Sequence, residues 1–280
     1  MLTVPAPAKL NLTLEVLGDR PDGFHEIRSV IQTISLADYL HFSPGEKLKF
    51  KSNSPGWDAG QSLVSKAVSL LQQITGCHRG ATIGVEKNIP LLSGLGGDSS
   101  DAAAVLRGLN QLWDLNLPVE KLLELSRQLG TDVAFFLYGG TALVEGRGEI
   151  VTPLPRFPHR WIVLVIPPVP RLIGKTGQLY ARLNAGHYSG GQITQKLVDA
   201  LSGKGRFTPS MLFNTFENVA FDYFPVADAC RSHLLKMGAP NVHLAGSGPA
   251  LFTLLDDKAR AEELYARCRQ QGLESYLTDT

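Results

Sequence analysis

"IPLLSGLGGDSSDAAAVL", residues 89–106, is the stretch that decides the interpretation of this chain. Three glycines, Gly94, Gly96 and Gly97, come before two serines and a run of alanines that favours a helix over 99–112. The start of a helix has unsatisfied N–H groups and a partial positive charge. Glycines before it remove Cβ atoms, so that an anion can approach the backbone closely. The stretch therefore predicts a phosphate-binding loop, and the alternative is a tight turn with an ordinary serine cap.

Other well-known loops do not fit these residues. Ser99 stands where a dinucleotide-binding fingerprint needs its third glycine, and Val169 stands where a P-loop ending in "GKT" at 174–176 needs its first. Ser247 lacks the glycine spacing of a hydrolase nucleophile elbow. Ser99 and Ser100 are instead expected to cap the helix, and their hydroxyls can also bind phosphate or the shell of a magnesium ion.

Composition limits the class of protein. The chain has 280 residues, of which 44% are hydrophobic, so it can bury the core of one large domain or two modest ones. Its 27 Lys and Arg against 26 Asp and Glu leave a charge of +1, which offers no basic field for nucleic acid or anionic lipid. Cys77, Cys230 and Cys268 form no metal or disulfide spacing and predict reduced, buried thiols in a cytoplasmic protein. No signal peptide or membrane span is expected.

Hydrophobic periodicity predicts both strands and helices along the whole chain. The strand at 9–18 is expected to be half-buried, with leucines and a valine on one side and polar residues on the other. Further strands are predicted over 29–43, 47–52, 80–90, 131–154 (short pieces around Gly139 and Gly140), 161–168 and 241–256 (two strands joined by a glycine turn). Helices are predicted over 60–76, 99–112, 118–130, 176–184, 194–203, 217–238 and 258–272. The proline-rich segment 154–160 predicts a linker between domains 1–157 and 158–280.

The pattern P-x-x-x-G-L-G-G-x-S-S-D-A-A-A, beginning at Pro90, resembles the phosphate loop of the GHMP small-molecule kinases, such as the homoserine and mevalonate kinases. Residues 5–30, 128–149 and 245–252 are similar to the same family in the same order, so the resemblance spans nearly the whole chain. It implies an α+β, two-domain GHMP kinase fold with a ribosomal S5 domain 2-like N-terminal domain and a ferredoxin-like C-terminal domain. It also implies ATP and Mg²⁺ as cofactors, with ATP held by Pro90, Leu91, Leu92, Ser93, Gly94, Leu95, Gly96, Gly97, Asp98, Ser99 and Ser100.

The activity implied by the resemblance is phosphorylation of the 2-hydroxyl of a cytidine diphosphate-linked methylerythritol, a step of non-mevalonate isoprenoid synthesis. The partner would be this small molecule, with no nucleic acid or membrane, and the protein would be a monomer or homodimer. The family's catalytic pair corresponds to Lys9, which would orient and polarise the hydroxyl, and Asp132, which would accept its proton. Taken alone, Lys9 is better explained as a surface lysine and Asp132 as a helix cap or turn residue, and only the set of motifs favours catalysis.

Four residues are expected to contact the substrate. Asn11 lies two positions after Lys9 and therefore on the same face of a strand. Phe24 and His25 follow a Pro-Asp-Gly turn and are implied to form the cytidine site, with Phe24 in place of the family's usual tyrosine. The alternative for this pair is a hydrophobic anchor beside a surface histidine. Thr176 corresponds to a substrate-contacting threonine of the second domain.

Two positions depart from the family pattern. Asp98 stands where a small residue is usual, and a carboxylate among phosphate-binding N–H groups would repel a nucleotide. Its side chain is therefore expected to face outward or toward a metal, with outward favoured. Ser62 stands where asparagine is common, which puts one nucleotide contact in doubt. Asn214 and Glu217 are interpreted as structural residues at the start of a helix.

Two other functions stay open. Another GHMP kinase with a different alcohol substrate would keep the glycine loop but would not depend on the cytidine group, so competition by CDP separates the two. A non-catalytic nucleotide-binding module, suggested by Asp98 and Ser62, would bind ATP without turnover. The presence of both Lys9 and Asp132 weighs against the module.

Overall fold

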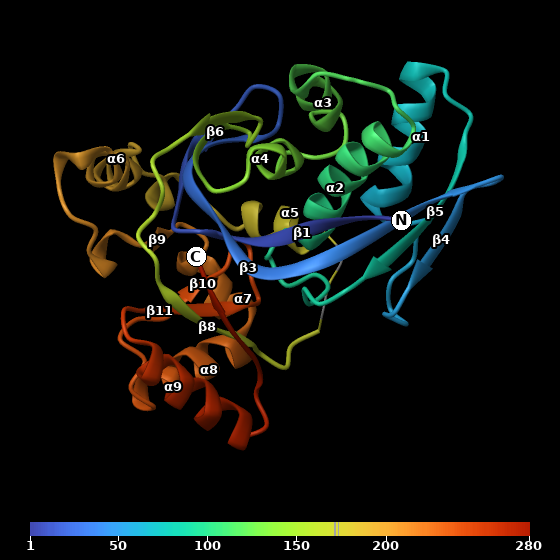
Figure 1. Ribbon diagram of the computed structural model, residues 1–280. Coiled ribbons are helices and arrows are strands. Elements are labelled where there is room, and N and C mark those ends of the chain that lie inside the picture. The colour runs from blue at the N-terminus through green and yellow to red at the C-terminus, as the bar shows by residue number, and fades with distance from the viewer. Residues whose placement is uncertain (171, 173) are drawn as a thin grey trace. The chain divides into compact units, whose positions relative to one another are not determined.

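The structure of this protein is a computed structural model that describes residues 1–170, 172 and 174–280 (Figure 1). The chain forms two compact units. Unit 1 comprises residues 1–8, 36–91 and 96–139, and unit 2 comprises residues 9–35, 92–95 and 140–280. Strands β1 (Leu2–Asn11) and β3 (His25–Gly45) each contribute residues to both units. The domain boundary between residues 157 and 158 stays a prediction.

Unit 1 combines a sheet segment with helices. Strand β4 (Lys49–Ser52) pairs in parallel with β5 (Gly80–Glu86), which pairs antiparallel with residues 39–45 of β3. The helices are α1 (Leu63–Thr75), α2 (Gly97–Leu112), α3 (Val119–Ser126) and α4 (Val133–Tyr138). Figure 1 shows α1 and α2 side by side, and α2 also packs on α4. The buried alanines 102–104 of α2 permit this close packing because their side chains are small.

Unit 2 contains strands that pair around the first half of β3. Strand β2 (Thr13–Asp19) and β6 (Thr141–Gly146) pair antiparallel with β3. Strand β7 (Ile150–Pro153) extends β6, and the short β9 (Phe213–Asn214) pairs in parallel with β2. Lys9 and Asn11 lie at the end of β1, and β2 begins two residues after Asn11.

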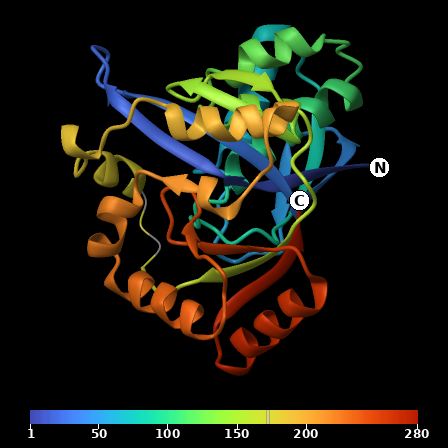
Figure 2. The same cartoon turned by 90° about the vertical axis from the view of Figure 1, so that its left-hand side faces the viewer.

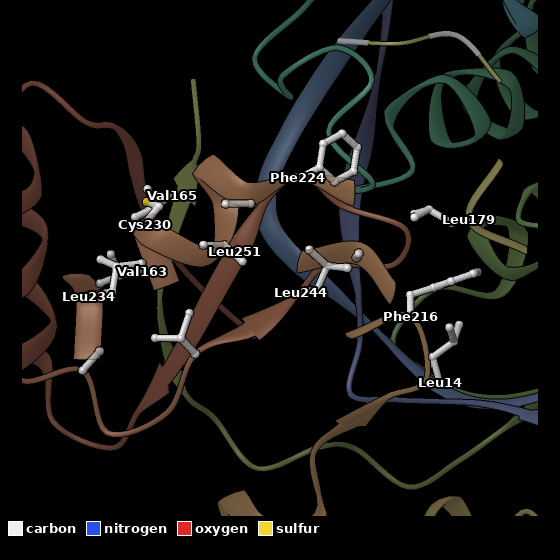
Figure 3. Packing of buried hydrophobic residues seen from close by; sticks show 14 of the residues in the cluster. Leu14, Val163, Val165, Leu179, Phe216, Phe224, Cys230, Leu234, Leu244 and Leu251 are labelled. Atoms are coloured by element: carbon white, nitrogen blue, oxygen red, sulfur yellow. The ribbon is translucent and has the colours of Figure 1, made fainter. Parts of the chain in front are cut away.

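A second sheet of unit 2 has the order β10-β11-β8-β12. Its strands are β8 (Trp161–Ile166), β10 (His243–Leu244), β11 (Leu251–Leu255) and β12 (Glu274–Asp279). The helices of unit 2 are α5 (Lys175–Tyr180), α6 (Gln192–Asp199), α7 (Glu217–Tyr223), α8 (Pro225–Lys236) and α9 (Lys258–Gln270). Figures 1 and 2 both show α8 and α9 on one face of this sheet. Cys230 and Leu234 of α8 pack there with Val163 and Val165 of β8 (Figure 3).

Much of the predicted secondary structure is confirmed, including the predicted strands at 29–43 and 161–168 and the helices at 60–76 and 258–272. The helix expected over 99–112 begins two residues earlier, at Gly97. The region 217–238 forms two helices rather than one, because Pro225 begins a new helix after Phe224. Glu217 begins α7, in agreement with its structural interpretation. Strand β12 was not predicted.

The prediction of short strands throughout 131–154 is wrong for its first part. Residues 133–138 form the helix α4, and strands begin only at Thr141. The run Val133–Leu137 is buried on all sides, against α2 and α3. Its sequence therefore shows neither the alternation of a half-buried strand nor the 3.6-residue period of an amphipathic helix.

The expectation that the strand at 9–18 is half-buried is also wrong. Its polar side chains Asn11, Thr13 and Glu15 are as buried as the apolar ones. Helix α6 covers them: the hydroxyl groups of Thr194 and Thr13 are 2.9 Å apart, and Thr194 N–H donates to Glu15 Oε2 at 2.6 Å. Buried polar groups thus find hydrogen bonds within unit 2.

The cysteines are unpaired throughout the described chain, as predicted, with Cys230 and Cys268 buried and Cys77 half-buried. None of the helices in the described residues is long and apolar enough to cross a membrane.

Candidate active site

Helix α2 begins without a side-chain cap. Gly96 is its N-cap residue, in the left-handed conformation (φ 75°, ψ 17°) that glycine adopts without strain. As a glycine, it has no side chain with which to cap the helix. Ser99 and Ser100 lie inside the first turn, so the predicted serine cap is wrong. The N–H groups of the first turn therefore keep the arrangement that binds anions at helix starts.

The other residues of the predicted loop differ in exposure. Pro90 is buried and Leu91 half-buried in unit 1, and Leu92 is exposed with a positive φ of 55°. Ser93 and Leu95 are buried in unit 2. The backbone carbonyl of Ser93 accepts a hydrogen bond from the N–H of Ala250 at 3.1 Å, and that of Leu95 accepts one from Lys9 at 3.0 Å.

Asp98 faces the start of α1. Its carboxylate accepts hydrogen bonds from the Ser62 hydroxyl and from Leu63 N–H, the latter at 3.0 Å to Oδ2. Ser62 is itself the N-cap residue of α1 and accepts from Val64 N–H at 3.1 Å. Asp98 is exposed, in agreement with an outward orientation, and the two departures from the family pattern are hydrogen-bonded to each other. Its negative charge stabilises the positive end of α1.

Replacing Asp98 by glycine is therefore expected to destabilise the protein rather than to improve nucleotide binding. The loss of hydrogen bonds to Ser62 and Leu63 should lower the free energy of unfolding by about 1 kcal/mol. The Kd of ATP should change less than about threefold, because the carboxylate is directed to α1. Urea unfolding and calorimetric titration with ATP check both expectations. A large gain in ATP affinity would show that Asp98 opposes the nucleotide.

Lys9 is a buried residue of unit 2, with 5% of its surface exposed, which contradicts the surface alternative. Its Nζ donates to Asn11 Oδ1 at 2.6 Å. Asn11 donates in turn to the Ser29 hydroxyl at 2.8 Å, and Ser29 donates to the carbonyl of Thr13 at 2.5 Å. The shared face expected for Lys9 and Asn11 is confirmed, and this chain of hydrogen bonds fixes the position of the ammonium group.

Gly94 makes room for protein rather than for a ligand. A Cβ atom there would lie 2.3 Å from the carbonyl oxygen of Ala245 and 2.9 Å from that of Gly248. The expectation that this glycine leaves space for phosphate is therefore wrong, because the turn at 245–248 occupies the space. The anion-binding role is left to the start of α2.

The turn at 245–248 lies beside Lys9. A Cβ atom on Gly246 would be 3.0 Å from the carbonyl oxygen of Gly94 and 3.1 Å from Lys9 Nζ. Asn214 holds the turn by donating to the carbonyl oxygens of Leu244 and Gly246 at 2.9 and 2.7 Å. The structural interpretation of Asn214 is confirmed by these bonds.

Thr176 contacts the same turn. The Thr176 hydroxyl, on an exposed residue, lies 2.8 Å from the hydroxyl of Ser247, and Lys175 Nζ donates to the same hydroxyl at 3.1 Å. Lys175 was not predicted as a site residue, although its neighbour Thr176 was.

Asp132 occupies the N-cap position of α4 in unit 1 and is half-buried. Among the described residues its side chain makes no capping hydrogen bond with that helix. The alternative interpretation, in which the Asp132 carboxylate caps this helix, is therefore not supported. Its catalytic role stays a prediction.

Phe24 and His25 lie in different surroundings. Phe24 is 51% exposed, which excludes a buried anchor, and the Arg147 guanidinium lies 4.8 Å from its ring centroid. His25 stacks on Tyr180 with ring centroids 4.5 Å apart, and its Nε2 lies 3.1 Å from Asp19. An exposed aromatic ring next to a hydrogen-bonding imidazole suits a heterocyclic base. The Tyr180 ring was not predicted.

A buried ionic group of unit 1 was also missed. Lys87 Nζ donates to Asp101 Oδ2 at 2.7 Å and to Asp38 Oδ2, and the three side chains are at most 4% exposed. Asp38 Oδ1 also accepts the N–H groups of Asn88 and Ile89 at 2.5 and 2.8 Å. Burial raises the pKa of Asp101 to about 8, against the opposing charge of Lys87. This group connects β3 and α2 just after the glycine loop.

The free energy of unfolding is expected to fall as the pH rises from about 4 to about 8 through Asp101. The unfolded carboxyl has a pKa near 4, so over this range the folded protein binds the extra proton and loses stability when it is removed. Asp101→Asn keeps a hydrogen-bond acceptor but does not titrate. The change in the free energy of unfolding between low and high pH should therefore be smaller in this variant by on the order of 1–3 kcal/mol. Urea midpoints at pH 5.5 and 8.5 check this. Equal pH dependence in both proteins would contradict it.

Comparisons with known proteins agree with these observations. The family model of the GHMP kinases N terminal domain matches residues 62–140, and that of the GHMP kinases C terminal matches residues 198–273. A 4-diphosphocytidyl-2-C-methyl-D-erythritol kinase of Dehalococcoides mccartyi is 50% identical over 100% of this chain and 98% of its own length. One of Geobacillus thermodenitrificans is 39% identical over 94% of this chain and 91% of its own.

The fold agrees with the same assignment. A crystal structure of a 4-(cytidine 5'-diphospho)-2C-methyl-D-erythritol kinase matches with a TM-score of 0.84 and 31% identity, covering 99% of this chain and 98% of that one. The expected α+β GHMP kinase fold is confirmed by this match and by the two family models. From the identity over its full length, the chain belongs to the 4-diphosphocytidyl-2-C-methyl-D-erythritol kinase family of the GHMP kinases.

Proposed function

We propose that this chain transfers the γ-phosphoryl group of ATP to the 2-hydroxyl of 4-diphosphocytidyl-2-C-methyl-D-erythritol, in non-mevalonate isoprenoid synthesis. The relatives that share 50% and 39% of its residues carry the name of this kinase. The structural observation that supports it best is the buried Lys9, whose ammonium is fixed by Asn11 and whose N–H donates to Leu95 of the glycine loop. A buried and oriented cation suits a reaction that depends on positioning and charge neutralisation.

The proposed residues have separate tasks. The start of α2 binds phosphate oxygens, Lys9 polarises the acceptor hydroxyl, and Asp132 accepts its proton. The hydroxyl oxygen attacks the γ-phosphorus, the bond to the bridging oxygen breaks, and ADP leaves. Phe24 and His25 bind the cytidine, and Thr176 contacts the substrate. The proposal places this reaction in the cytoplasm, where ATP is supplied.

Mg²⁺ is part of this proposal. In the described part of the chain no group of three or more His, Cys, Asp or Glu residues could hold a metal ion. Mg²⁺ is commonly held by substrate phosphates, waters and few protein oxygens. The buried Ser100 hydroxyl, which has no hydrogen-bond partner among the described residues, fits such a role. With ATP bound, Mg²⁺ would neutralise charge on the phosphates.

The non-catalytic alternative loses its main support in this structure. It was suggested by Asp98 and Ser62, and these two residues form the cap of α1 together. Their identity is therefore explained by local structure rather than by loss of activity.

The test is a coupled assay for ADP release with ATP and the cytidine-linked alcohol, followed by ³¹P NMR of the product. We expect a new phosphomonoester signal, and competition by CDP. Homoserine and mevalonate serve as acceptor controls and should give no product. ADP release with either control but not with the cytidine-linked alcohol would replace the proposed substrate, and ATP binding without turnover would favour the module.

A further inference from the structure

Lys175 is a buried lysine that the proposed mechanism does not use. It is the first residue of α5 and has 6% of its surface exposed, whereas Gly174 and Thr176 on either side are exposed. Its Nζ donates to the Ser247 hydroxyl at 3.1 Å. Among the described residues no carboxylate forms an ion pair with it. Lysine is rarely buried without such a partner, so its position requires an explanation.

A second ammonium group lies close to it. Burial, and after it the charge of Lys9, lower the pKa of Lys175 to about 8. Lys175 donates to Ser247. The preceding residue of the turn, Gly246, lies against Lys9, because a Cβ atom on Gly246 would be 3.1 Å from Lys9 Nζ. The turn at 245–248 thus brings both ammonium groups to adjacent positions in unit 2.

A buried ammonium group such as that of Lys175, with no carboxylate of the described residues beside it and a second ammonium group nearby, destabilises the folded protein unless an anion binds next to it. The turn is held rigidly by Asn214, and the carbonyl oxygen of Gly94 lies against Gly246, so the lysines cannot separate by a simple movement of the turn. Ammonium groups are good ligands for phosphate oxygens, and such contacts are strongest in buried surroundings.

We propose that Lys175 is a second phosphate-binding residue of this active site, which binds phosphate oxygens of a ligand together with Lys9. This inference rests on the proposed function because it takes Lys9 to be part of the kinase site. Both substrates carry phosphate, so the oxygens can belong to ATP or to the diphosphate of the cytidine-linked alcohol. Separate titrations with ADP and with CDP distinguish these two sources.

The test compares Lys175→Met with Lys196→Met, a control that removes an exposed lysine of α6 in the same unit. We expect kcat/KM of Lys175→Met to fall about 10- to 100-fold, as for loss of a charged hydrogen bond. The Kd of either ADP or CDP should rise at least fivefold, and the affected ligand identifies the source. The melting temperature without ligand should rise by a few degrees, because an unpaired buried charge is removed. Lys196→Met should match the wild type in all three measurements.

A purely structural role for Lys175 predicts different results. If Lys175 only positions Ser247, then Ser247→Ala should lose as much activity as Lys175→Met, and Lys175→Met should melt at a lower temperature. Either that pattern or unchanged kcat/KM and Kd values in Lys175→Met would overturn the inference. The two proposals fail separately: if wild type does not phosphorylate the cytidine-linked alcohol, the ADP and CDP titrations and the melting temperatures still decide whether Lys175 binds phosphate.

Discussion

Asp132→Asn is expected to lower kcat by about 100- to 10,000-fold, the usual contribution of a general base. Asparagine keeps the size of the side chain but cannot accept the proton of the acceptor hydroxyl. The Kd of ATP should stay within roughly threefold of the wild-type value, because Asp132 is proposed to act on the acceptor and not on the nucleotide. Steady-state ADP release and calorimetric titration with ATP measure the two quantities.

Asp114→Asn is a matched control for this substitution. The Asp114 side chain is 83% exposed in the same unit, and its φ of 52° is a conformation that asparagine readily adopts. This control should keep the wild-type rate. A wild-type rate in Asp132→Asn would end the assignment of the base, and a parallel loss of ATP binding would indicate a structural defect instead.

Lys87→Met is expected to produce the largest loss of stability, about 3–5 kcal/mol in the free energy of unfolding. The substitution leaves Asp38 and Asp101 buried without their cation, and both carboxylates are fully inaccessible. Because the group lies between β3 and α2, the start of α2 should also become less well fixed. The urea unfolding midpoint measures the loss.

Lys66→Met, on the exposed side of α1 in the same unit, controls for the removal of a lysine. Its unfolding free energy should change by less than about 0.5 kcal/mol. If Lys87→Met is as stable as this control, the buried ionic group does not contribute as described.

The glycine loop and the helix after it could be predicted because their signals are local. Backbone geometry at Gly96 and the alanine run of α2 depend on a few neighbouring residues. The role of Gly94 could not be predicted, because the space that it leaves is filled by a turn more than 150 residues later in the chain, at Ala245. Such long-range packing leaves no trace in a short stretch of sequence.

Buried polar residues were the main source of error. Thr13 and Glu15 alternate with leucines and so indicate a half-exposed strand, yet α6 covers them. Alternation shows which side of a strand is polar, but the polar side is exposed to solvent only when no other element covers it and supplies its hydrogen bonds. The helix α4 was missed for the opposite reason, because a short and entirely apolar run fits a strand and a buried helix equally well.

The candidate site shows the same division. Lys9 and Asn11 could be paired because they are two residues apart on one strand. Lys175 and the group formed by Lys87, Asp38 and Asp101 could not be found, since their members come from separate elements and a single lysine or aspartate most often lies at the surface. Only the three-dimensional structure shows that Lys175 is buried, and that Lys87, Asp38 and Asp101 are buried in contact with one another.

The central claim is that Lys9 and Asp132 act on one hydroxyl in one step. It is tested most directly by kcat/KM for ADP release in wild type, Lys9→Met, Asp132→Asn and the double variant. Side chains that act in the same step lose their effects jointly, so the losses should not multiply. We predict that the double variant reacts about as fast as the slower single variant. A loss equal to the product of the two single losses would contradict the claim.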